Sequence, residues 1–175
     1  FISVLEVTVL CADLATVIDG RQLDDDGSAL LRFNNGARGT LLASQVCAGM
    51  GNGLQISVYG ELGSLSWQQE QPDQLILQMR GQPQQTWQAG TDKAYLAPQV
   101  RAWCRTPAGH PEGYLEGFAN IYAEAARAIL ARRDGTALDA AVTFPGLKEG
   151  LEGVAYVDAC VRSSKKNGAW TALNL

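Results

Sequence analysis

Alternation of apolar and polar residues runs through roughly the first ninety positions of this chain, and only two long helical patterns follow it. In Leu54–Tyr59, and again in Asp73–Arg80, apolar side chains take alternate positions and therefore one face of a strand. The opposite face is a mixed surface of Ser, Thr, Gln and aromatic side chains. Because an apolar sheet face has to be buried against other elements, the chain is restricted to layered folds.

Turn residues separate the expected strands. The clearest signal is Asn34-Asn35-Gly36, which predicts a hairpin between the strands on either side of it. The expected strands are Ile2–Leu10, Ser28–Phe33, Arg38–Gln45, Leu54–Tyr59, Ser64–Gln69, Asp73–Arg80, Gln84–Gln88 and Ala169–Leu173.

Two segments have helical spacing. The first begins at Pro111, a favoured first residue of a helix, and ends before Gly135; the second follows Pro145 and ends before Gly168. The apolar residues expected to face the core are Leu115, Phe118, Ile121, Tyr122, Ala125 and Ile129 in the first helix, and Leu147, Leu151, Val154, Val157 and Val161 in the second. We therefore expect an α+β, two-layer domain with an open, mostly antiparallel sheet and two long helices on one face.

Size and charge limit the classes of partner. The chain has 175 residues, 46% hydrophobic and 18% charged, which is ordinary for one globular domain with a full core. A net charge of −4 without a basic stripe argues against nucleic acid or an anionic membrane as partner. No apolar run is long enough to cross a bilayer. The chain opens on Phe1 without a methionine, so we expect it to begin inside a larger protein.

Four cysteines, Cys11, Cys47, Cys104 and Cys160, stand far apart, and the chain has a single histidine. This spacing does not suit a zinc site, so no metal site is expected. We expect reduced, mostly buried thiols in a cytoplasmic protein. A cysteine nucleophile partnered by His110 stays open, because the sequence does not show whether the two side chains meet.

Two further motifs have ordinary explanations. The glycine-rich stretch Gly49–Gly53 precedes a strand rather than a helix, so we interpret it as a strand connection and not as a phosphate-binding loop. The acidic stretch Asp24–Gly27 does not match a calcium loop, and we interpret it as a solvated turn before a strand.

The only histidine, His110, directly precedes the expected start of the first long helix. It has two interpretations, a helix cap or a contact to a ligand, since a neutral imidazole offers one donor and one acceptor. The preceding stretch, Thr91–Gly109, resists assignment and is expected to be a long ordered loop over the sheet. In this loop Arg101 and Arg105 alternate with Trp103, so their guanidinium groups could share a face and bind an anion, although an ordinary surface explains this spacing equally well.

Several motifs occur in an order and spacing that resemble one known family over roughly 150 residues. They are Leu23–Gly39, Ala43–Gln45, Val58–Trp67, Gly109–Tyr114, and Gly150–Val154 with Ser163-Ser164 before Trp170. In these motifs the chain is similar to the C-terminal domain of the Gfo/Idh/MocA family, the oxidoreductases that include glucose–fructose oxidoreductase, inositol dehydrogenase and rhizopine-catabolism proteins.

The resemblance implies a two-domain enzyme that binds NAD or NADP on an N-terminal Rossmann domain and oxidises or reduces a sugar, polyol or cyclitol. It implies that residues 1–175 are the C-terminal substrate-binding and oligomerisation domain, and that the Rossmann domain is absent from this chain. The family's catalytic lysine and its Asp-x-x-x-His segment would both precede Phe1. We therefore expect no catalytic residue in this chain, no cofactor on it alone, and a homo-oligomer formed through the open sheet face. The substrate-side candidates are His110, Arg105, Gln45 and Asn52.

Three functions remain open on the sequence. The first is the dehydrogenase domain just described, which would be inactive alone. The second is a noncatalytic sugar-binding or scaffold domain of the same fold. The third is a self-contained hydrolase or lyase that uses His110 with a cysteine or a carboxylate, although the sequence offers no residue to orient such a pair.

Overall fold

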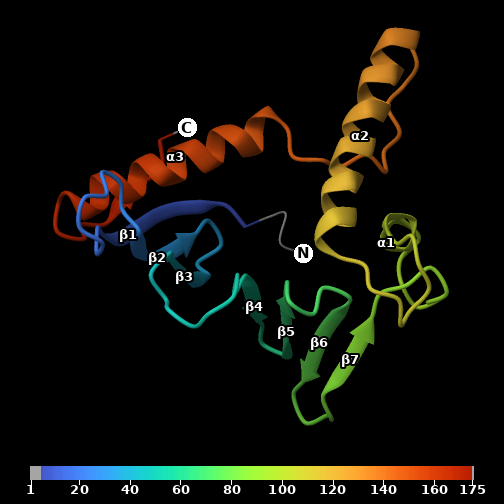
Figure 1. Cartoon of the computed structure of the whole chain (residues 1–175), viewed down its shortest axis with the longest axis horizontal. Helices are drawn as coiled ribbons and strands as arrows, with labels where there is room; N and C mark the ends of the chain where they lie inside the picture. Colours follow the sequence, from blue (N-terminus) through green and yellow to red (C-terminus); the bar gives the residue numbers. More distant parts are fainter. Residues whose placement is uncertain (1–4, 175) are drawn as a thin grey trace. The chain divides into compact units, whose positions relative to one another are not determined.

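The computed structural model describes residues 5–174, whose backbone falls into two compact units (Figure 1). One unit combines the chain up to Gly49 with the chain from Pro145 onward, and the other spans Met50–Phe144. The strands are β1 (Val7–Ala15), β2 (Asp26–Phe33), β3 (Arg38–Ser44), β4 (Gln55–Tyr59), β5 (Gly63–Gln68), β6 (Gln74–Met79), β7 (Gln85–Gln88) and β8 (Thr171–Ala172). The helices are α1 (Pro98–Trp103), α2 (Tyr114–Asp134) and α3 (Leu147–Ser164). Among the described residues, no helix combines the length and apolarity that a membrane span requires.

In the first unit, helix α3 packs on an antiparallel sheet of strand order β3-β2-β1-β8 and lies along β1 (Figure 1). The core lies between the helix and the sheet. Its buried residues are Leu10, Ala12, Ala29, Leu31, Ala159 and Cys160. Complete burial of a leucine side chain such as Leu10 stabilises a fold by about 1.5–3 kcal/mol.

The predicted hairpin between β2 and β3 is confirmed. Gly36 has a φ of +86°, a left-handed conformation that glycine adopts without steric cost. The Asn35 side chain closes the turn by accepting a hydrogen bond from the backbone N–H of Ala37 at 3.0 Å. The turn residues therefore form the connection that the sequence predicts.

The second unit contains a separate antiparallel sheet of strand order β4-β5-β6-β7. Its register confirms the predicted alternation, because apolar residues stand opposite one another across neighbouring strands. The residues on this face are Ile56, Val58, Leu65, Trp67, Leu75, Leu77 and Trp87. On the other face the hydroxyl groups of Ser57 and Ser66 lie 3.0 Å apart.

The α+β class and the open antiparallel arrangement are confirmed, and the described strands are divided between two sheets of four. The division falls at the connection between β3 and β4. Gly49 and Gly53 in this connection have positive φ values of +88° and +64°. Left-handed residues turn the chain away from extended geometry, so β4 starts a new sheet instead of continuing the first one.

The face of α3 that packs on the sheet differs from the predicted one. In α3 the residues expected to be buried but exposed by more than half are Leu147, Leu151, Val154 and Val157, and the same prediction is wrong in α2 for Leu115, Tyr122 and Ile129. The residues of α3 that are buried instead are Ala159, Cys160 and Ser163. Small side chains let the helix approach the sheet closely, so the spacing of the large apolar residues predicted the helix correctly but not its buried face.

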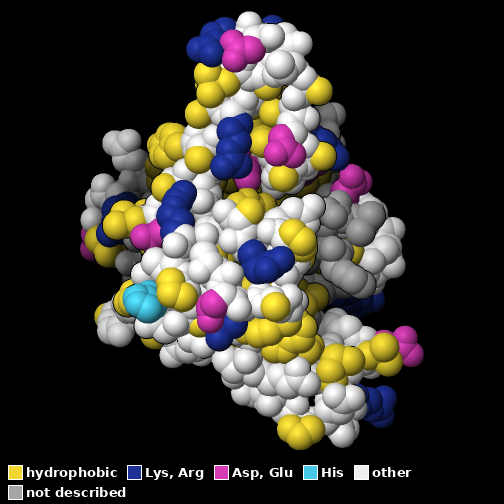
Figure 2. Space-filling model, turned by 90° about the vertical axis from the view of Figure 1, so that its right-hand side faces the viewer, with side chains coloured by type: hydrophobic (Ala, Val, Ile, Leu, Met, Phe, Trp, Pro, Cys, Tyr) yellow, Lys and Arg dark blue, Asp and Glu magenta, His cyan; other side chains and the backbone are white. Residues whose placement is uncertain are grey.

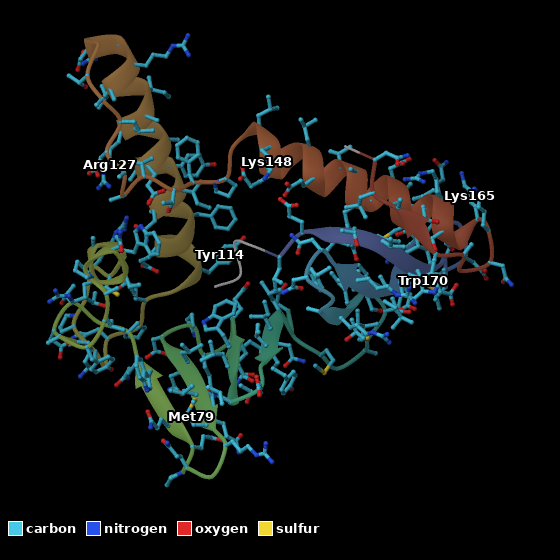
Figure 3. All side chains as sticks on the ribbon, turned by 180° about the vertical axis from the view of Figure 1, so that it is seen from behind. Met79, Tyr114, Arg127, Lys148, Lys165 and Trp170 are labelled. Atoms are coloured by element: carbon cyan, nitrogen blue, oxygen red, sulfur yellow. The ribbon has the colours of Figure 1, made fainter. Side chains whose placement is uncertain are left out.

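The ends of several elements also differ from the prediction. Helix α2 begins at Tyr114, labelled in Figure 3, rather than at Pro111. Gly113 is its N-cap and donates its N–H to the Glu116 carboxylate at 2.8 Å. Strand β1 is displaced from the predicted Ile2–Leu10, of which residues 2–4 lie outside the described part of the chain. The short helix α1 lies within the stretch that resisted assignment.

All four cysteines are free thiols. Cys160 is buried, Cys11 and Cys104 are partly buried, and Cys47 is exposed, so the expectation that most are buried is wrong.

Candidate functional site

The residues before α2 form an ordered loop that one carboxylate holds together. The backbone N–H of Arg105 lies 2.8 and 2.9 Å from the two carboxylate oxygens of Glu112. Thr106 donates to the same carboxylate through its backbone N–H at 3.0 Å and its hydroxyl at 2.9 Å. Because hydrogen bonds to an ionised carboxylate are stronger than neutral ones, Glu112 fixes the path of the chain at Arg105.

A second carboxylate fixes the next part of the loop. The Asp92 side chain accepts a hydrogen bond from the backbone N–H of Ala108 at 2.8 Å. This bond lowers the pKa of Asp92 below its ordinary value, burial opposes the shift, and Lys93 supports it. A Cβ at Gly90 would lie 2.5 Å from the Ala108 nitrogen, so this close approach requires glycine.

The Arg105 side chain is oriented by α2. Its Nη2 group donates to Asn120 Oδ1 at 2.7 Å, and Asn120 Nδ2 donates to the Trp103 carbonyl at 3.0 Å. Because arginine can only donate and a carbonyl can only accept, Asn120 must direct its Oδ1 atom at Arg105 and its Nδ2 atom at the Trp103 carbonyl. The two contacts therefore require the same orientation of the Asn120 amide. Arg105 is itself exposed, and its guanidinium is held at a surface that a small molecule can reach.

His110 lies on the same loop as Arg105 but has only local contacts among the described residues. Its Nδ1 atom lies 3.2 Å from the Pro107 carbonyl, and its backbone N–H donates to the same oxygen. Gly113 is the N-cap of α2, three residues further on, so the interpretation of His110 as a helix cap is wrong. The histidine side chain is exposed at the surface (Figure 2).

A buried carboxylate, Glu124, anchors the loop by hydrogen bonds, and the sequence analysis did not identify it as a candidate. Glu124 is 5% exposed on α2 and accepts hydrogen bonds from the Trp103 indole at 2.8 Å and the Thr143 backbone at 2.9 Å. The hydrogen bond from Thr143 has the largest effect on the pKa of Glu124, and that from Trp103 the next largest. Together they hold this pKa below its ordinary value, although burial raises it. Glu124 therefore ties α1 and the segment before α3 to the middle of α2.

The other two predicted site residues lie elsewhere in the chain. Gln45 follows β3 in the first unit, where its backbone N–H donates to the Asp25 carbonyl at 2.8 Å. Asn52 is exposed in the connection between β3 and β4, in the second unit. The structure thus places Arg105 and His110 on one loop, while Gln45 belongs to the other unit.

The acidic stretch before β2 is not a solvated turn. Asp25 is 5% exposed and accepts hydrogen bonds from the backbone of Val17 at 2.7 Å and Ile18 at 3.1 Å, with Arg21 at 3.2 Å. The bond from Val17 is the main cause that lowers the pKa of Asp25. A buried carboxylate with these partners organises the loop between β1 and β2, and no cluster of metal-ligating residues occurs in the described part of the chain.

A nicotinamide dinucleotide requires a strand, a glycine-rich loop and a helix in succession. The stretch Gly49–Gly53 joins β3 to β4, which confirms the interpretation as a strand connection. It lacks the helix N-terminus that binds a pyrophosphate. This stretch therefore does not fit the pyrophosphate of such a cofactor.

The proteins similar to this chain in sequence are described as oxidoreductases. Residues 3–173 match the Gfo/Idh/MocA sequence profile described as "Oxidoreductase family, C-terminal alpha/beta domain". An uncharacterized oxidoreductase of Bacillus subtilis, YfiI, is 32% identical over 168 residues, which are 95% of this chain and 42% of the relative.

Solved structures agree with the sequence matches. An oxidoreductase from Sinorhizobium meliloti is 47% identical with a TM-score of 0.88, over 95% of this chain and 46% of that protein. An inositol dehydrogenase homologue from Azotobacter vinelandii, in complex with NADH and myo-inositol, is 35% identical with a TM-score of 0.89, over 96% of this chain and 44% of that protein. The chain spans less than half the length of each of these relatives.

Proposed function

Since this chain belongs to the Gfo/Idh/MocA oxidoreductase family, whose C-terminal α/β domain it matches, we propose that it is the substrate-binding half of an NAD- or NADP-dependent dehydrogenase of a sugar, polyol or cyclitol. The observation that carries the proposal is the likeness to the inositol dehydrogenase homologue, whose structure contains NADH and myo-inositol. At 35% identity and a TM-score of 0.89, the two chains share their backbone over nearly all of this chain.

The proposed enzyme divides its work between two domains. The nicotinamide would be bound by a separate Rossmann-type domain, because the described residues lack the strand, glycine loop and helix that such a cofactor needs. The residues of this chain would bind and orient the substrate. We place this enzyme in the cytoplasm, where free thiols such as the four present here are maintained.

We assign substrate contacts to Arg105 and His110, with Gln45 and Asn52 as further candidates. Polyol hydroxyl groups both donate and accept hydrogen bonds, and these side chains supply both kinds of partner. All four residues are exposed, and Arg105 is held in place by Asn120. Arg105 is therefore the substrate contact that we expect to matter most.

We also propose that the sheet face opposite α3 binds a second copy of the chain. This face has a shallow hollow of about 440 Å³, and Leu30 and Leu42 in its lining are 50% and 73% exposed. The Arg32 guanidinium lies 3.9 Å from the centre of the ring of Trp170, the residue directly before β8 that Figure 3 labels. Exposed apolar faces are commonly covered by two-fold pairing of identical surfaces.

Initial rates of the complete enzyme test the proposal. We expect NAD or NADP to be reduced in the presence of a cyclitol, a linear polyol or an aldose, with saturation by at least one of them. Binding of a polyol without turnover would instead favour the noncatalytic sugar-binding domain. Absence of both turnover and binding across the panel would overturn the proposal.

A further inference from the structure

We propose that Asn120 is a positioning residue that orients Arg105 to offer a two-pronged N–H fork to neighbouring hydroxyl groups of an uncharged polyol. This inference rests on the proposed function. Its structural basis is the pair of hydrogen bonds that Asn120 forms, to Arg105 Nη2 at 2.7 Å and to the Trp103 carbonyl at 3.0 Å.

Asn120 links two parts of the chain that would otherwise be independent. It lies on α2, whereas the Trp103 carbonyl is at the last residue of α1 and lacks a helical partner there. Satisfying this carbonyl fixes the amide plane, and the fixed Oδ1 atom then defines where the Arg105 guanidinium lies. The Glu112 carboxylate holds the backbone of Arg105 at the same time. Arg105 is thus fixed at both ends of its side chain.

The guanidinium retains most of its donors. It has five N–H groups, of which one is directed at Asn120. Its other N–H groups have no protein partner in the described part of the chain. At least one complete fork of two parallel N–H groups therefore remains, and such a fork matches two oxygen atoms held side by side.

Nearby carboxylates favour a neutral ligand over an anionic one. Glu112 is bonded to the backbone of Arg105 itself. Glu116 is also close enough that Arg105 helps to lower its pKa, after the hydrogen bonds from Gly113 and from its own N–H. These two negative charges offset the single positive charge of Arg105, so a sugar acid or sugar phosphate would gain little from it. Adjacent hydroxyl groups of a polyol fit both the fork and the charge.

A double-mutant cycle in the complete enzyme tests the inference. Asn120→Ala should fold, because alanine is the better helix former. We expect Asn120→Ala to raise the KM for a vicinal polyol about 5-fold to 30-fold with little change in kcat, because the Arg105 donors are then no longer held in place. In an Arg105→Ala background the same substitution should leave KM unchanged. Arg132→Ala, an exposed change on the same helix, is the matched control.

Each outcome separates this inference from the proposed function. An unchanged KM in Asn120→Ala, or an equal rise in the Arg105→Ala background, would overturn the positioning role while leaving the dehydrogenase intact. A sugar acid that is bound more tightly than the matching polyol would overturn the charge argument. A wild-type enzyme that neither turns over nor binds any polyol would overturn the proposed function and this inference together.

Discussion

Ser163 accepts a hydrogen bond from the backbone N–H of Ala12 at 2.9 Å, although the two residues are 151 positions apart. The same hydroxyl donates to the Ala169 carbonyl at 2.7 Å. Within residues 5–174, strand β8 pairs with β1 only at Val9 and Leu10, so no described strand pairs with this side of β1 after Leu10. The fully buried Ser163 hydroxyl supplies the hydrogen-bond acceptor that a neighbouring strand would otherwise provide to Ala12.

Ser163→Ala should therefore loosen β1 locally. The substitution leaves the buried Ala12 N–H without an acceptor, which costs about 1–3 kcal/mol. We expect the Ala12 amide to exchange with solvent about 10-fold faster or more in hydrogen-exchange measurements on the complete protein. Ser57→Ala, whose hydroxyl is exposed, is the matched control and should leave Ala12 unaffected. Equal exchange in wild type and Ser163→Ala would contradict the role assigned to this hydroxyl.

Glu124 should make the stability of the second unit depend on pH. Hydrogen bonds from Thr143 and Trp103 lower its pKa from the ordinary 4.5, so the folded protein binds this proton less readily than the unfolded chain does. Its stabilising effect is present above pH 4.5 and is lost as the pH falls through the lowered pKa.

Thermal melts between about pH 3 and about pH 6 check this expectation. Wild type should lose melting temperature on acidification more steeply than Glu124→Gln. Glu61→Gln, at an exposed position in the turn between β4 and β5, should follow wild type. Parallel curves for wild type and Glu124→Gln would show that this carboxylate is not the source of the dependence.

His110→Asn separates a substrate contact from a purely structural role. The imidazole contacts only the Pro107 carbonyl among described residues, so the melting temperature should not change. Loss of a hydrogen-bonding partner should lower kcat/KM for the polyol, mainly by raising KM. The loss corresponds to about 1–3 kcal/mol of transition-state stabilisation. Steady-state kinetics of the complete enzyme measure this, and wild-type values in His110→Asn would remove the residue from the site.

Leu42→Glu should weaken self-association. Leu42 is exposed on the sheet face opposite α3, and a carboxylate there would have to be desolvated when two copies pair. Sedimentation at about 10 μM should show a shift from oligomer towards monomer. Leu62→Glu, an equally exposed change in the second unit, should have no such effect. A monomeric wild type, or an unchanged oligomer in Leu42→Glu, would exclude this interface.

Local patterns predicted the elements of this fold well, and long-range contacts account for what they missed. The turn at Asn35 and Gly36 depends on neighbouring residues alone, so its sequence was sufficient to predict the hairpin. The burial of Ser163 depends on where α3 crosses β1, which periodicity does not report. Large apolar residues at helical spacing on α3 suggested the wrong buried face for the same reason.

The site shows the same limit. Arg105 and His110 were candidates because of their residue types and their place before a helix. Asn120 and Glu112 were not singled out, because their roles depend on how the loop folds back on α2 and on itself. The sequence contains a weak signal for Glu112, a carboxylate directly after His110-Pro111, but its partners become evident only in the folded chain.

The most direct test of a substrate-binding role is the effect of Arg105→Ala on two Michaelis constants of the complete enzyme. We expect the KM for the polyol to rise at least about 10-fold, because a fixed guanidinium donor is lost, while the KM for the nicotinamide stays at its wild-type value. A rise in the nicotinamide KM with an unchanged polyol KM would contradict the assignment of this chain to the substrate side.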